Sequence, residues 1–128
     1  MIYVDSSVVL ARVFVEDRRP LDGFWLERLT SSALLQYEVW NRVHARRLAK
    51  SHGTEVNAVL DRIGTTAMSE PALARALLPW PTPIRTLDAL HLATMEFLRL
   101  RGEPIALASY DNRLIAGARA LGIAISEL

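Results

Sequence analysis

The stretch that decides the fold is the opening one, Met1-Ile2-Tyr3-Val4-Asp5. Its continuous apolar and β-prone residues, followed by polar ones, are typical of a short strand that is buried on both faces. Asp5 stands where this strand ends. In an open α/β sheet, ligands bind outside the carboxyl ends of the strands. The Asp5 carboxylate is therefore predicted to point toward a site rather than into the core.

A second aspartate stands at the end of a second apolar run. Asp111 follows Tyr110 and the strand predicted for residues 105–109. Each aspartate has an alternative interpretation as the cap of the helix that follows it, a position that aspartate favours. The occurrence of the same arrangement at two strand ends favours a site, and the capping alternative stays open.

The rest of the chain alternates between short strands and helices. We expect strands at residues 2–5, 30–33, 65–69, 105–109 and 123–125. We expect helices beginning at Ser6 or Ser7, then at 21–29, 34–50, 54–63, 71–78, 87–101 and 112–121, with Thr54 and Thr86 as caps and Gly53, Gly64, Gly102 and Gly122 at helix ends. This order predicts an α/β fold of three layers, α/β/α, around a mainly parallel sheet of four to five short strands.

The composition is that of one globular domain spanning residues 1–128. Hydrophobic residues make up 51% and charged residues 23% of the chain. The chain has no cysteine, which excludes disulfides and thiolate metal sites, and its three histidines share no ligand spacing. The net charge of +1 gives no strong overall field toward nucleic acid. We expect neither a signal peptide nor a membrane span, and a cytoplasmic location.

Two further acids, Glu38 and Asp88, fall on predicted helices among apolar neighbours. Glu38 has the alternative of an ion pair with Arg42, four residues on. Asp88 has the alternative of a favourable position in the first turn of its helix. The residues that follow Asp88 on the same face make that face look partly buried, and a buried carboxylate is costly unless it is paired or bound to metal. Four converging acids would bind a divalent cation such as Mg²⁺.

At this point four motifs together resemble the PIN domain, and within it the VapC-type toxins of bacterial toxin–antitoxin pairs. The motifs are Ile-Tyr-Val-Asp5-Ser6-Ser7, Ser31-Ser32-Ala33-Leu34 leading to Glu38, Arg85-Thr86-Leu87-Asp88-Ala89-Leu90-His91-Leu92-Ala93, and Ala108-Ser109-Tyr110-Asp111-Asn112-Arg113-Leu114. Each motif alone is weak, but all four in this order are specific. The resemblance runs from Met1 to Leu128.

The resemblance implies a ribonuclease that depends on Mg²⁺ or Mn²⁺. It assigns the catalytic and metal-binding acids to Asp5, Glu38, Asp88 and Asp111. It places supporting hydroxyl groups at Ser6 and Ser109, and Asn112 stands where some relatives carry an additional acid. Metal-assisted phosphodiester cleavage agrees with such a set of carboxylates. A VapB-type antitoxin, an RNA substrate and a homodimer are the partners that the resemblance implies.

Two groups of surface residues are candidates for binding RNA and antitoxin. Arg42, Arg46 and Lys50 follow Glu38 at a spacing of four, and Arg85 precedes Asp88. On one helix face these cations could follow an RNA backbone, although a solvated helix face is the alternative. Phe14, Trp25 and Trp40 are candidates for a groove that binds an antitoxin helix. We expect His91 to be a packing residue hydrogen-bonded to the backbone.

Three other function classes fit this sequence less well. A phosphoacceptor receiver domain also has acids at strand ends, but it needs a lysine after a late strand, and Lys50 is the only lysine. A P-loop enzyme is excluded because the Gly-rich phosphate loop is missing. The remaining alternative is a binding module that kept the PIN fold and lost catalysis, against which the four intact acids argue.

Overall fold

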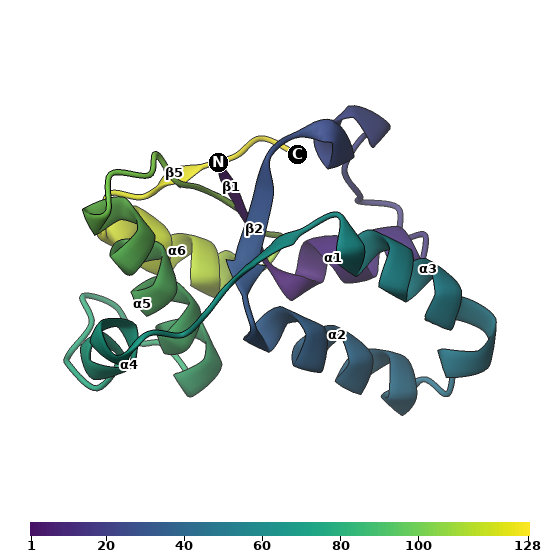
Figure 1. The fold of residues 1–128 in the computed structure, drawn as a ribbon, viewed down its shortest axis with the longest axis horizontal. Helices are drawn as coiled ribbons and strands as arrows, with labels where there is room; N and C mark the ends of the chain where they lie inside the picture. The colour runs from purple at the N-terminus through teal and green to yellow at the C-terminus, as the bar shows by residue number, and fades with distance from the viewer.

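A parallel sheet of five strands lies in the middle of the molecule (Figure 1). The structure is a computed structural model that describes residues 1–128. The strand order is β3-β2-β1-β4-β5, and every pairing is parallel. The strands are β1 (Ile2–Val4), β2 (Leu29–Ser32), β3 (Gly64–Thr66), β4 (Ala106–Ala108) and β5 (Ala124–Ile125). The predicted α/β class and the upper limit of five strands are confirmed.

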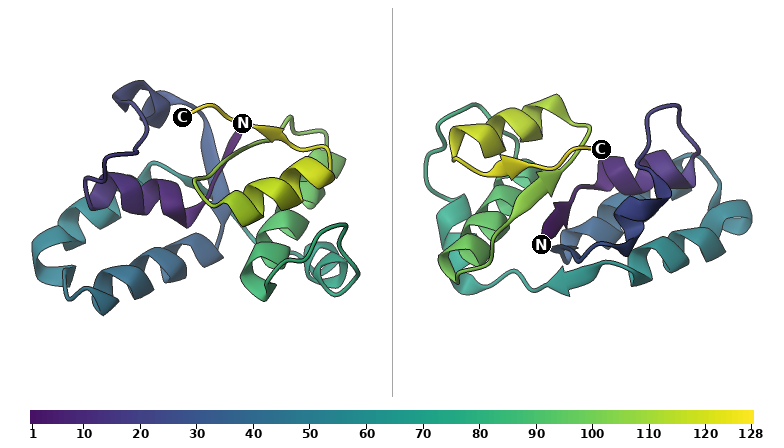
Figure 2. Two further views of the ribbon diagram at one scale, coloured as in Figure 1. Left: turned by 180° about the vertical axis from the view of Figure 1, so that it is seen from behind. Right: turned by 90° about the horizontal axis from the view of Figure 1, so that it is seen from above.

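Helices cover both faces of this sheet, as the two further views show (Figure 2). One side carries α1, α2 and α3, and the other carries α4, α5 and α6 (Figure 1). The helices are α1 (Ser6–Val13), the 3₁₀ helix η1 (Asp22–Leu26), α2 (Leu34–Ala45), α3 (Ala49–Asp61), α4 (Glu70–Ala76), α5 (Thr86–Leu100) and α6 (Asn112–Ala120). None of them has the length and hydropathy that a membrane crossing would require.

The central strand β1 divides the core into two clusters. Successive side chains of a strand point to opposite faces. Val4 accordingly packs with α1, α2 and α3, whereas Tyr3 packs with α5, α6 and β4. Val4 pairs with Ala108 of β4, and the next amide, that of Asp5, donates to the Ala108 carbonyl at 3.0 Å. The carboxyl ends of β1 and β4 therefore meet, although about a hundred residues separate them in the chain.

The helix ends explain several differences from the sequence-based expectations. Asp5, rather than Ser6 or Ser7, is the N-cap of α1, and its carboxylate accepts from the Ser7 amide. The N-cap of α5 is Arg85, without a side-chain bond, so Thr86 is the first helical residue and not a cap. At the other helix ends, Gly102 and Gly122 have φ angles of +88° and +74°. These are left-handed values that glycine adopts without strain, as expected for residues that end helices.

The helix predicted for residues 34–50 is wrong, because it divides into two. α2 ends at Ala45, and α3 begins at Ala49 after a turn in which Arg47 has a φ of 56°. Gly53 and Thr54, expected to end one helix and begin another, lie inside α3. A Cβ atom on Gly53 would stand 3.5 Å from the Trp40 ring, so this glycine lies where α3 crosses closely over α2.

Candidate active site

An open cleft of about 880 Å³ lies at the carboxyl edge of the sheet. Glu38 of α2, Asp88 of α5 and Asp111, the N-cap of α6, bring their side chains to it from three elements. Its complete lining is Glu38, Arg42, Arg85, Thr86, Leu87, Asp88, Asp111, Asn112 and Arg113. Asp5 is 6% exposed and lies behind this lining, close enough for its charge to raise the pKa of Asp88.

Two serine hydroxyls hold the Asp5 carboxylate. Ser7 Oγ donates to Asp5 Oδ2 at 2.6 Å, and Ser109 Oγ donates to the same oxygen at 2.8 Å. Ser6, expected in this role, makes no such bond. The first turn of α1 directs Ser7 toward the end of β4, where its oxygen also accepts from the Tyr110 amide at 2.9 Å. The position of Ser109 in contact with Asp5 follows from the pairing of β1 with β4.

Asp111 is both a helix cap and a residue of the cleft, the two roles that its sequence position left open. Its Oδ1 accepts from the Arg113 amide at 2.9 Å and from the Leu114 amide at 3.4 Å, so it caps α6. Its own amide donates to Ser109 Oγ at 2.9 Å. The carboxylate also lines the cleft, and its charge raises the pKa of Asp88. Capping one helix with one oxygen thus leaves the other oxygen for the cleft.

Glu38 is held by His91 and not by Arg42. His91 Nε2 lies 2.5 Å from Glu38 Oε1, and His91 Nδ1 lies 2.7 Å from the Tyr3 hydroxyl. The expectation of a backbone bond for His91 is therefore wrong. Burial lowers the pKa of His91, but the bond to Glu38 and the negative charges of Glu38, Asp5 and Asp88 outweigh burial, so that the pKa is raised overall.

Asp88 has no hydrogen-bond or ion-pair partner in the protein. Burial and the negative charges of Asp111 and Asp5 raise its pKa, and His91 lowers it by less than they raise it. A favourable helix-end position alone would shift the pKa in the opposite direction. The helix-dipole alternative therefore does not account for the raised pKa of Asp88, whereas burial together with repulsion by the neighbouring carboxylates does.

The four acids offer the oxygen donors that Mg²⁺ and Mn²⁺ prefer. As the side chains lie, no group of three or more acids and histidines could hold a metal ion. The negative charges of Asp111 and Asp5, which together with burial raise the pKa of Asp88, oppose closer approach of these carboxylates in the absence of a cation. Asp5, Glu38 and Asp111 each accept protein hydrogen bonds on one oxygen, Oδ2, Oε1 and Oδ1 respectively, and so retain a second. The donor set therefore fits a hard divalent cation.

Comparison with known proteins agrees with this arrangement. Residues 2–120 match the family model of the PIN domain. The chain belongs to the PIN domain family. It is 30% identical to Ribonuclease VapC47 of Mycobacterium tuberculosis, over 95% of this chain and 93% of that protein. It is 31% identical to Ribonuclease VapC35, over 98% and 95%, and 33% identical to Ribonuclease VapC46, over 97% and 95%, both of the same organism. With such relatives over nearly its whole length, it is a VapC-type PIN domain.

Three arginines surround the acids of this PIN domain. Arg42, Arg85 and Arg113 line the cleft and are exposed. Arg113 is not among the RNA-binding residues predicted from the sequence, although its position in the first helical turn after the strand-end acid Asp111 is a signal that could have identified it. Arg46, the C-cap of α2, and Lys50, which lies in α3 beyond the turn, do not line the cleft. Arg46 lies instead over the Phe14 ring, 4.1 Å from its centre.

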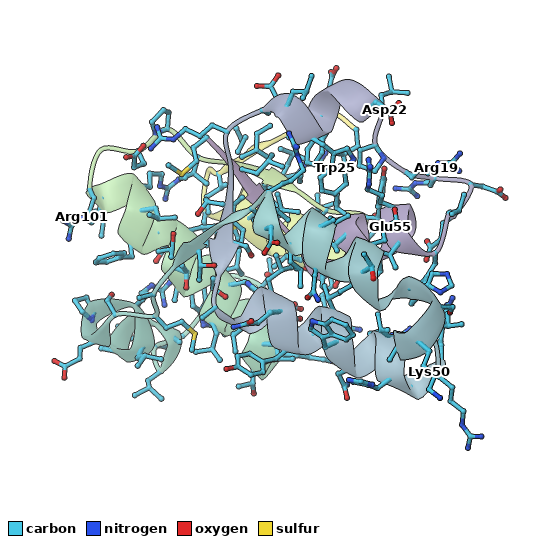
Figure 3. The ribbon with its side chains drawn as sticks, turned by 45° about the vertical axis from the view of Figure 1, so that its right-hand side comes forward. Arg19, Asp22, Trp25, Lys50, Glu55 and Arg101 are labelled. Atoms are coloured by element: carbon cyan, nitrogen blue, oxygen red, sulfur yellow. The ribbon has the colours of Figure 1, made fainter.

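Two labelled side chains show how far the candidate surfaces differ from expectation (Figure 3). Lys50 projects from the outer end of the α2–α3 pair into solvent, while Trp25 points from η1 into the molecule. Trp25 is only 4% exposed and belongs to the core cluster, which leaves it little surface for contact with an antitoxin. Phe14 and Trp40 are partly buried against the same cluster, with limited surface left for a partner.

Proposed function

We propose that this PIN domain is a metal-dependent endoribonuclease and the toxin of a VapBC-type pair, which cleaves cellular RNA and so inhibits translation. The observation that carries the proposal is the convergence of Glu38, Asp88 and Asp111 on one cleft, with Asp5 directly behind it. The relatives named ribonucleases support the choice of RNA as substrate.

The carboxylates of Asp5, Asp88 and Asp111 would hold Mg²⁺ or Mn²⁺, and Glu38 would complete the site or orient the attacking water. When bound, such a cation neutralises phosphate charge and makes water a stronger nucleophile. Ser7 and Ser109 keep Asp5 fixed through Oδ2, which leaves Oδ1 as its ligand oxygen. Asn112, at the start of α6 on the cleft wall, adds neutral polar surface where a further acid would add charge.

The arginines supply the substrate side of the site. Arg42, Arg85 and Arg113 line the same cleft as the acids, and guanidinium groups bind phosphates with two parallel hydrogen bonds. A carboxylate-lined centre with a cationic rim would bind the scissile phosphate through metal and the flanking phosphates through arginine. This arrangement favours single-stranded RNA that can enter an open cleft.

The proposed protein partners are those expected of a VapC-type toxin. A VapB-type antitoxin would block the cleft, and a homodimer would be the working form, in the cytoplasm where the RNA substrates are. Phe14 and Trp40 remain candidates for the antitoxin groove through their exposed edges, without Trp25.

The direct test is cleavage of total cellular RNA by the purified chain. We expect cleavage with Mg²⁺ or Mn²⁺, no cleavage with chelator, and near-complete loss in Asp88→Asn. Asp61→Asn, an exposed acid at the end of α3, is the matched control and should cleave normally. Metal binding measured by calorimetry with no cleavage of any RNA fraction would instead indicate the inactive binding module.

A further inference from the structure

A buried chain of hydrogen bonds leads from the sheet to one acid of the cleft. The Ser32 amide of β2 donates to the Tyr3 hydroxyl of β1 at 3.1 Å. The Tyr3 hydroxyl lies 2.7 Å from His91 Nδ1 of α5, and His91 Nε2 lies 2.5 Å from Glu38 Oε1 of α2. Tyr3 is 0% and His91 1% exposed. The chain therefore crosses from one helix layer to the other beneath the cleft.

The protons of this chain have one arrangement when the imidazole is neutral. A backbone amide can only donate and a carboxylate can only accept, so the Tyr3 oxygen accepts from Ser32 and Glu38 Oε1 accepts from His91 Nε2, which leaves Nδ1 to accept from the Tyr3 hydroxyl. Burial raises the pKa of Tyr3 above its ordinary value, which keeps the hydroxyl protonated. His91 must then carry its proton on Nε2 and donate it to Glu38. Protonation of the ring leaves that Nε2–H in place.

Packing alone does not explain polar groups at these positions. The buried core cluster around Tyr3 is otherwise made of leucine, isoleucine, methionine and alanine side chains such as Leu92 and Met95. Burying a hydroxyl and an imidazole among them is costly unless both are fully hydrogen-bonded. The Ser32 amide, the Tyr3 hydroxyl and both ring nitrogens of His91 are hydrogen-bonded, and the last bond ends on the only member that reaches the cleft, Glu38.

We propose that His91 is a positioning residue, which holds Glu38 Oε1 so that the second oxygen faces the cleft, and that Tyr3 fixes the orientation and tautomer of His91. Groups that hold a metal or a water are commonly oriented by such a partner behind them. The inference rests on the proposed function, because it gives Glu38 a task in the cleft. It adds that α2 and α5 are tied together beneath that site.

Three variants test the proposal. His91→Leu fills the space without either bond. His91→Gln offers an amide oxygen to Tyr3 and an amide N–H to Glu38. Tyr3→Phe removes only the hydroxyl. We expect His91→Leu to lower Mn²⁺ affinity, measured by calorimetry, and kcat on RNA by about ten- to a hundredfold, with KM little changed. His91→Gln should recover most of both, and Tyr3→Phe should lose less than His91→Leu.

Coupling to Glu38 separates positioning from a general effect on folding. In a Glu38→Gln background, His91→Leu should cause little further loss of kcat. Full loss again in that background, or a folded His91→Gln as impaired as His91→Leu, would overturn the proposal. If His91→Leu does not fold, the metal affinity and kcat of His91→Gln and Tyr3→Phe, each measured against the unaltered chain, still test the proposal.

A spectroscopic measurement needs no metal and no RNA. Nitrogen NMR of the histidine rings in the metal-free chain, at a pH where the imidazole is neutral, should show His91 with its proton on Nε2. A proton on Nδ1 would overturn the proposal. Metal binding by the unaltered chain that His91→Leu leaves unchanged would refute this inference alone, whereas no metal binding by the unaltered chain would refute the proposed function.

Discussion

The two acids at strand ends and the two acids on helices are held in different ways. Asp5 and Asp111 each cap the helix that follows, and serine hydroxyls or backbone amides bond to one oxygen of each. Glu38 depends instead on a histidine from another helix, and Asp88 has no partner. Strand-end acids thus serve the fold and the site together. Of the helical acids, Glu38 joins α2 to α5 through His91, whereas Asp88 only adds repulsion to the fold.

We expect the largest effect on activity from removing one negative charge from the cleft. Asp5→Asn, Asp88→Asn and Asp111→Asn should each reduce RNA cleavage by about a hundredfold or more. Metal stabilisation of transition-state charge is worth several kcal/mol, and about 1.4 kcal/mol corresponds to tenfold in rate. Single-turnover cleavage in saturating Mn²⁺ measures the effect. Any of the three that cleaves at the normal rate does not belong to the site.

Stability should separate the two pairs of acids. Asparagine is a good N-cap and alanine is a poor one, by about 1 kcal/mol. In chelator, Asp111→Ala should therefore unfold more easily than Asp111→Asn, while Asp88→Ala and Asp88→Asn should be at least as stable as the unaltered chain. Urea unfolding of the metal-free proteins measures both. Equal stability of the two Asp111 variants would mean that the cap bond contributes nothing.

The stability of the folded chain should depend on pH through Asp88 and through His91, the partner of Glu38. The pKa of Asp88 is raised above its ordinary 3.8 in the folded chain, so over that interval the folded chain binds more protons than the unfolded one. Its stability contribution therefore falls as pH rises through this range. The pKa of His91 is raised above 6.5, so its contribution is complete below 6.5 and is lost as pH rises through the folded value.

Thermal melts of the metal-free chain measure these contributions. Above pH 3.8 and well below pH 6.5, where His91 is charged in both states, Asp88→Asn should lose less stability with rising pH than the unaltered chain. Asp61→Asn should keep the original dependence. An unchanged profile in Asp88→Asn would show that its carboxylate does not experience the neighbouring charges.

The smallest expected effect concerns the arginine rim. Arg42→Ala should reduce the slope of log affinity against log salt for single-stranded RNA by about 0.7, as expected for one phosphate contact. Lys50→Ala is the control, because Lys50 lies at the outer end of the α2–α3 pair (Figure 3). Binding assays with a metal-free Asp88→Asn background avoid cleavage. Equal slopes for both variants would place the RNA elsewhere.

Local patterns in the sequence carried most of the fold and the four acids. The strands β1 and β4 are apolar runs that end in aspartate, and both the sheet and its parallel direction followed from them. The division of α2 from α3 could not be predicted, because Arg47 takes a left-handed conformation without glycine and Gly53 marks a helix crossing rather than a helix end. The hydrogen bond between His91 and Glu38 joins residues fifty-three apart and depends on tertiary packing.

The pairing of β1 with β4 has a consequence for the time at which the protein becomes active. Asp5 is synthesised before the serine and the aspartate that complete its surroundings, because these belong to Ser109-Tyr110-Asp111, about a hundred residues further along the chain. Contacts between residues so distant in sequence form late. A chain that has not yet been synthesised as far as Asp111 therefore lacks the centre that attacks RNA, and the ribosome that makes this toxin is not exposed to it before that point.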